Sequence, residues 1–150
     1  MTEAEFRFKH SEIIEYYQNI EMRLKGICAA LDAEKEIDWF QGLDDHESDP
    51  LGKLLQEIQV LQQQRQMEFL KPEDFQGLDN LRQARNYWVH QCFANSNGGI
   101  SFKQNGELRK SEYGRRLRRD LHDAEEWEEK VTKVGHSVLF HLKELLQATE

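Results

Sequence analysis

The sequence predicts an all-α protein, built as an antiparallel four-helix bundle with a long connection before the last helix. Three observations support this prediction. Apolar residues recur at helical spacing in four stretches, both prolines stand where such a stretch begins, and a run rich in asparagine and glycine precedes the last stretch. With 150 residues, the chain is expected to form one domain over residues 1–150.

The first helix is expected to start after Thr2, because Thr2 and Glu5 have the spacing of a capping box. Apolar residues then follow one another at alternating steps of four and three: Ile13, Tyr17, Ile20, Leu24, Ile27 and Leu31. This spacing of about 3.5 residues is typical of a helix packed nearly parallel or antiparallel to its neighbours.

The prolines mark the next two helices, because a proline at the first helical position gives up no needed hydrogen bond. Pro50 opens a segment with apolar residues at helical spacing: Leu51, Leu54, Leu55, Ile58 and Leu61. Pro72 opens the third helix, where Glu73 and Asp74 favour the positive end of the helix dipole.

The last helix follows the long connection. Residues 95–99 are expected to end the third helix, and residues 100–108, around Asn105 and Gly106, fit a short β-hairpin. From Ser111, a typical N-cap residue, an apolar pattern runs nearly to residue 150: Leu117, Leu121, Ala124, Val131, Val138, Leu142 and Leu145.

The composition favours a folded cytoplasmic protein without a cofactor. No apolar run is long enough to span a membrane, and no secretory signal is recognisable, so neither a membrane partner nor export is expected. Cys28 and Cys92 are too few and too far apart for a disulfide framework or a zinc knuckle. The histidines lack metal-ligand spacing, so no metal site is predicted.

Positive charge gathers in one place, although the formal net charge is -8. Six cations lie close together: Arg109, Lys110, Arg115, Arg116, Arg118 and Arg119. Such a run can bind an RNA backbone, since phosphates neutralised by cations release counterions whatever the base sequence. A solvated helix start is the alternative, although a basic start opposes the helix dipole.

The third helix has a second, mixed face beside an ordinary core face. Its core face carries Leu81, Ala84, Trp88 and Cys92, and an arc roughly 100° away carries Arg82, Asn86, Val89 and Phe93. A partly apolar second face favours contact with another copy of the chain, so we expect a homodimer. In a twofold dimer, Arg85 and His90 of both copies would converge in one cleft.

Arg85, Asn86 and His90 are the candidate catalytic residues. Histidine can take a proton from a ribose 2′-OH or give one to the leaving oxygen, and arginine can neutralise charge that develops on the phosphate. Asn86 lies one turn before His90 and could orient the imidazole or contact the substrate. A structural role for the histidine and arginine is the common alternative, so the residues alone leave both interpretations open.

The segment Arg85-Asn86-Tyr87-Trp88-Val89-His90 resembles the R-x4-6-H motif of the HEPN superfamily. The resemblance covers residues 78–93 closely and the four-helix architecture loosely. It implies a helical bundle that dimerises through the motif-bearing helices and cleaves RNA without a metal, as toxins and antiphage effectors of this family do. Arg85 and His90 would then be the catalytic pair, with Asn86 supporting them. Arg82, on the mixed arc of the same helix, is predicted to bind RNA as well.

The resemblance also implies a protein partner, such as an antitoxin or a nucleotidyltransferase. In one toxin–antitoxin group, such a transferase modifies a tyrosine two residues beyond the histidine; this chain departs from that pattern with Cys92. Two alternatives to an endoribonuclease stay open. One is a non-catalytic HEPN module that binds a nucleotide or a partner protein, and the other is an acidic helical interaction protein.

Overall fold

The computed structural model describes residues 1–33, 41–43, 50–93 and 99–148. Four long helices occur in this part of the chain: α1 (Glu3–Asp32), α3 (Leu51–Arg65), α4 (Pro72–Asn86) and α5 (Ser111–Ala148). A single π-helical turn, η1 (Tyr87–Gln91), continues α4. No strand is present among the described residues, so the predicted all-α class is confirmed.

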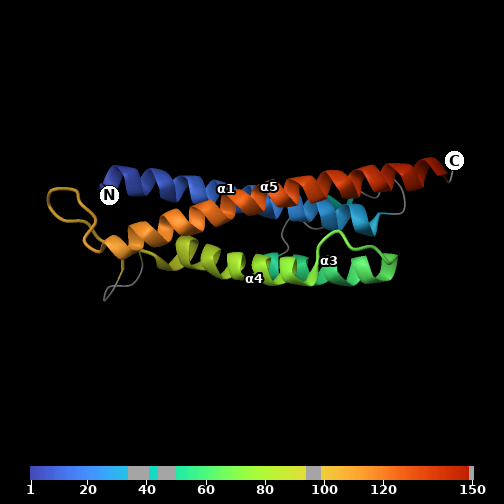
Figure 1. Cartoon of the computed structure of the whole chain (residues 1–150), viewed down its shortest axis with the longest axis horizontal. Helices are drawn as coiled ribbons and strands as arrows, with labels where there is room; N and C mark the ends of the chain where they lie inside the picture. The colour runs from blue at the N-terminus through green and yellow to red at the C-terminus, as the bar shows by residue number, and fades with distance from the viewer. Residues whose placement is uncertain (34–40, 44–49, 94–98, 149–150) are drawn as a thin grey trace.

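The directions of the helices refine the predicted antiparallel bundle. Figure 1 shows α1 and α5 running the same way along one side of the molecule, with α4 running the opposite way beneath them. Consistent with this view, Met1 lies beside Gly114 and Ile27 lies beside Gly135. The antiparallel arrangement therefore holds for α4 against α5, whereas α1 and α5 are parallel.

The parallel course of α1 and α5 is consistent with how α3 lies against α1. Near the end of α3, Arg65 donates hydrogen bonds to the carbonyls of Leu31 and Ala33 at the end of α1, at 2.5 and 2.8 Å. The C-terminal ends of α1 and α3 therefore lie at the same end of the bundle. Two reversals later, α5 again runs in the direction of α1.

The predicted helix starts are found. Thr2 Oγ1 accepts a hydrogen bond from Glu5 N, and Glu5 Oε2 accepts one from Thr2 N, each at 3.2 Å, which completes the capping box. Pro50 is the N-cap of α3, and Pro72 is the first residue of α4. Ser111 is the first residue of α5.

The core lies between α1 and the other helices. The whole apolar stripe predicted for α1 is buried: Ile13, Tyr17, Ile20, Leu24, Ile27 and Leu31. Buried residues of the remaining helices pack against it: Leu54, Ile58, Leu78, Leu117, Ala124 and Val131. None of the described helices combines the length and the apolar composition that a membrane span requires.

The segment predicted as a β-hairpin forms a turn with isolated bridges instead of strands. Gly106 adopts a φ of 86°, which favours glycine, and Phe102 bridges Leu108. This turn also bonds to the start of α1. Glu3 N donates to Gly106 O at 2.7 Å, and Leu108 N donates to Met1 O at 2.9 Å. This connection therefore covers the end of the bundle where α5 begins.

Candidate functional site

Trp88 anchors the candidate site to the core. Its side chain is fully buried, and its indole Nε1 donates to Asp120 Oδ2 of α5 at 2.8 Å. Leu81 and Cys92 are buried on the same face, as predicted. A buried indole N–H needs a partner, so this bond holds η1 in register with α5.

The helix that carries the motif was predicted to be a regular α-helix. In the structure it ends in a π turn instead. In η1, Cys92 N donates to Tyr87 O, five residues back, at 2.9 Å, where an α-helix would use Trp88 O. The released Trp88 carbonyl accepts from His10 Nε2 of α1 at 2.8 Å and from Cys92 Sγ at 3.2 Å. Side chains thus replace the α-helical bond at this turn.

Arg85 is held by α1. Its Nη2 lies 2.8 Å from Glu21 Oε1 in an ion pair, and both side chains are largely buried. Its Nη1 also donates to Asn86 Oδ1 at 3.4 Å. Asn86 therefore contacts Arg85 in this structure, and a hydrogen bond from Asn86 to His90, one of its two predicted roles, is not found among the described residues.

His90 faces the surface from η1. In the part of the chain that the structure describes, its imidazole forms no hydrogen bond or ion pair. Its exposed apolar neighbours are Val89, at 44% exposure, and Phe93, at 43%. Within the mixed arc predicted on this helix, Val89 and Phe93 are thus exposed, whereas Arg82 and Asn86 are partly buried.

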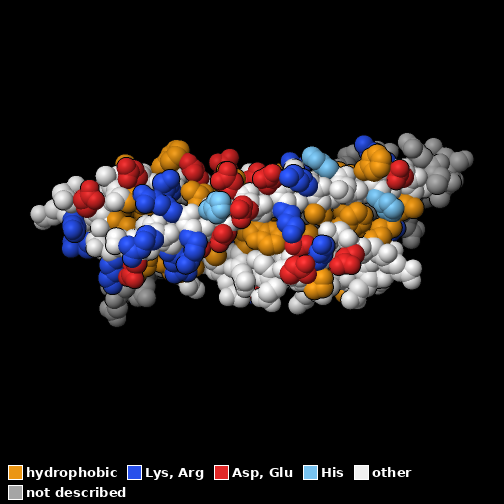
Figure 2. All heavy atoms as spheres, in the orientation of Figure 1, with side chains coloured by type: hydrophobic (Ala, Val, Ile, Leu, Met, Phe, Trp, Pro, Cys, Tyr) orange, Lys and Arg blue, Asp and Glu red, His pale blue; other side chains and the backbone are white. Residues whose placement is uncertain are grey.

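The start of α5 brings the basic run to the same end of the bundle as His90. Figure 2 shows Lys and Arg side chains gathered over the first turns of α5. Among the described residues, four of the six predicted cations are exposed and lack an ion pair: Arg109, Lys110, Arg115 and Arg118. These four remain available for an anionic polymer.

The other predicted RNA-binding cations have partners within the chain. Arg116 stacks over the Tyr87 ring, with its guanidinium carbon 3.6 Å from the centroid, and lies 3.7 Å from Asp120. Arg119 also pairs with Asp120, at 3.5 Å, but is mostly exposed, and Arg82 pairs with Asp79 at 2.9 Å. Arg116, predicted to bind RNA, therefore packs α5 against η1.

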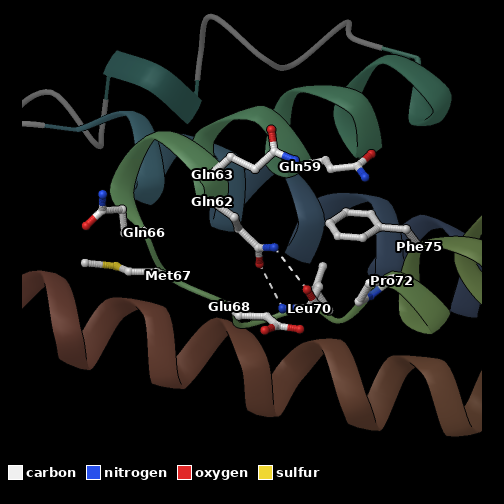
Figure 3. A pocket seen from close by; sticks show the side chains of 9 residues that line it. All are labelled: Gln59, Gln62, Gln63, Gln66, Met67, Glu68, Leu70, Pro72 and Phe75. Atoms are coloured by element: carbon white, nitrogen blue, oxygen red, sulfur yellow. Dashed lines mark hydrogen bonds between the residues drawn. The ribbon is translucent and has the colours of Figure 1, made fainter.

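Neither Arg85 nor His90 lines any of three surface pockets on the described part of the chain. Figure 3 shows the first, of about 400 Å³, where Gln62 bonds to both backbone groups of Leu70 beneath the side chains of Gln59, Gln63 and Phe75. Its lining contains no predicted site residue.

The second pocket, of about 430 Å³, lies between α1, α4 and α5 and includes Arg119 and Asp120. The buried Tyr17 hydroxyl also lines it, and no partner for this hydroxyl is found among the described residues. Burial raises the pKa of Tyr17, and the charges of Asp120 and Asp123 add to this effect.

Neither a metal site nor a similar protein assigns a role to these residues. Within residues 1–33, 41–43, 50–93 and 99–148, no group of three His, Cys, Asp or Glu side chains is arranged to hold a metal ion. No protein-family model, curated protein or solved structure matches the chain. The proposal below therefore rests on the sequence motif and on the geometry around it.

Two residues of this site were missed from the sequence. His10 had a detectable signal: it lies three residues before Ile13, in phase with the apolar stripe of α1, where a polar side chain needs a partner. Glu21 had none, since its contact with Arg85 spans 64 positions and depends on how α1 and α4 cross.

Proposed function

We propose that the chain is a metal-independent endoribonuclease of the HEPN type, with a role as a toxin or antiphage effector. The observation that carries the proposal is the contrast between the two motif residues. Arg85 forms an ion pair with Glu21, whereas His90 is exposed on the continuation of the same helix without a partner among the described residues. An arginine and a histidine on one helix, the histidine unengaged among the described residues, are side chains that suit phosphodiester chemistry.

In the proposed reaction, one His90 imidazole removes the proton from a ribose 2′-OH, which attacks the adjacent phosphate. Arg85 stabilises the charge that develops on the phosphate oxygens, and the second His90 protonates the leaving 5′ oxygen. The P–O5′ bond breaks as the P–O2′ bond forms. The products are a 2′,3′-cyclic phosphate and a 5′-OH end.

A homodimer supplies the second histidine in this proposal. Val89 and Phe93 are large apolar side chains with nearly half their surface exposed, and they flank His90 along the helix. Burial of this arc against its counterpart would remove apolar surface from water and bring both copies of Arg85 and His90 together. RNA would reach this cleft along the exposed cations at the start of α5.

The direct test is cleavage of a mixed RNA pool in EDTA by the wild type, Arg85→Ala and His90→Ala. Loss of one acid–base group should lower the rate by roughly 10²–10⁴-fold. Arg23→Ala and His136→Ala are matched controls, because both side chains are exposed on other helices. Intact RNA with the wild type, or equal cleavage by the motif variants, would refute the proposal.

One observation favours a second candidate, a non-catalytic HEPN module that binds a nucleotide or a partner protein. Arg85 is already neutralised by Glu21 within the single chain, which is how a structural arginine is held. This candidate predicts that Arg85→Ala mainly lowers stability. Under the nuclease proposal, the same substitution mainly lowers the cleavage rate.

A further inference from the structure

The relative direction of Arg85 and His90 depends on the type of turn between them. On a regular α-helix, residues five apart point about 140° away from each other. A π turn closes its hydrogen bond over five residues and holds about one residue more. Since the steps from Tyr87 to His90 lie within η1, this turn swings His90 back toward the strip that carries Arg85.

The only contact from another helix to the released carbonyl, among the described residues, comes from His10. Its Nε2 lies 2.8 Å from Trp88 O, and because a carbonyl oxygen can only accept, this nitrogen carries the hydrogen. The ring is fixed at the same time by Phe93, whose centroid is 5.4 Å away, and by Trp88 at 6.3 Å. The His10 side chain of α1 thus points at the backbone of η1.

We propose that His10 is a positioning residue for the candidate site. By donating to Trp88 O, it stabilises the π turn against the α-helical alternative, and the π turn sets the direction of His90 relative to Arg85. This inference rests on the proposed function for its effect on catalysis. Its structural part, the dependence of η1 on His10, stands without it.

The π turn leaves the carbonyl of Trp88 without its α-helical donor. In a regular helix, Trp88 O would accept from Cys92 N, but in η1 that N–H serves Tyr87 O. A buried carbonyl without a donor is costly, so η1 persists only if other donors reach it. Cys92 Sγ is a weak donor from within the turn, and His10 is the stronger one.

Two substitutions of His10 form a matched pair. In His10→Gln the amide nitrogen stands near the position of Nε2 and can still donate, whereas in His10→Asn it stands near Nδ1 and falls short of Trp88 O. Each variant keeps a neutral polar side chain at the same place. His122→Ala, on the exposed face of α5, controls for loss of a histidine elsewhere.

The first readout is the hydrogen bond itself, measured as the NMR scalar coupling from Cys92 N to the carbonyl carbon of Tyr87 or of Trp88. We expect the wild type and His10→Gln to couple to Tyr87, and His10→Asn to couple to Trp88. A coupling to Tyr87 that persists in His10→Asn would overturn the inference, whether or not the protein cleaves RNA.

The second readout is kinetic and applies once wild-type cleavage is established. His10→Asn should lower kcat by about tenfold to a hundredfold with little change in KM, because the imidazole is misdirected while RNA still binds. His10→Gln should recover most of kcat. Equal kcat values for both variants would overturn the inference, and an inactive wild type would refute only the proposed function.

Discussion

Arg85 Nη2 lies 2.8 Å from Glu21 Oε1, so the arginine of the motif is tied to α1 in the single chain. This ion pair both orients the guanidinium and neutralises part of its charge. Under the nuclease proposal, the phosphate of the substrate would compete with Glu21 for this cation.

The first prediction concerns this competition. In Glu21→Gln the side chain keeps its size but loses its charge, so we expect KM for RNA to fall by up to about fivefold and the free energy of unfolding to fall by less than about 1 kcal/mol. Steady-state cleavage and urea unfolding measure the two effects. A rise in KM would mean that orientation by the carboxylate outweighs its neutralising effect.

The second prediction concerns the proposed homodimer. Val89→Asp places a charge at the centre of the exposed arc, so we expect the dimer dissociation constant to rise at least about a hundredfold and cleavage to be lost. Light scattering after size exclusion measures the mass. Val60→Asp is the control, because Val60 is similarly exposed but lies on α3. A Val89→Asp variant that stays dimeric would rule out this face as the interface.

The third prediction concerns the packing of α4 against α5. A Cβ added at Gly77 would lie 2.3 Å from Trp127 Cζ2, so Gly77→Ala must displace the indole. We expect a loss of about 1–2 kcal/mol in the free energy of unfolding, despite the better helix propensity of alanine.

Gly26→Ala is the matching substitution in α1, because a Cβ at Gly26 meets no atom of the described residues within 4 Å. Propensity alone should stabilise this variant by about 0.5–1 kcal/mol. Denaturant unfolding of both variants gives the comparison, and equal effects would contradict the close contact at Gly77.

The fourth prediction concerns acid stability. Burial alone would raise the pKa of Asp74, but hydrogen bonds from Lys130 and from the backbone N–H of Lys71 outweigh it, so the pKa is lowered. A lowered pKa stabilises the fold above the ordinary carboxyl pKa of about 4, and this stabilisation is lost as the pH falls through the folded value.

Asp74→Asn should therefore be about 1–2 kcal/mol less stable than the wild type at pH 7, and this difference should shrink toward pH 3. Thermal or urea unfolding at several pH values measures it. Asp123→Asn is an exposed carboxylate control on α5. A difference that is constant with pH would contradict the assigned role of the Asp74 charge.

Much of the fold was predictable because it depends on local patterns. The capping box of Thr2 and Glu5, the helix start at Pro72 and the buried stripe of α1 are each encoded within a few turns of sequence. The parallel course of α1 and α5 was not predictable in this way. An apolar stripe identifies the face that is buried, but it carries no information about the direction of the neighbouring helix.

The candidate site was predictable only in its residue types. The stretch from Arg85 to His90 identified the helix, but the π turn depends on His10, 78 positions before Trp88. Likewise, the partner of Arg85 lies on α1, and Arg116 was indistinguishable from its basic neighbours until Tyr87 was found against it. These features arise from contacts between distant segments, which no local spacing records.

The most direct test of the nuclease proposal uses one RNA with a mapped cleavage site and the same RNA with a single 2′-deoxy sugar at that site, both incubated with the wild type in EDTA. Because the attacking group is the 2′-OH, the account predicts cleavage of the first RNA, with a 2′,3′-cyclic phosphate end, and none at the modified position of the second. Cleavage at the 2′-deoxy position, or no cleavage of either RNA, would contradict it.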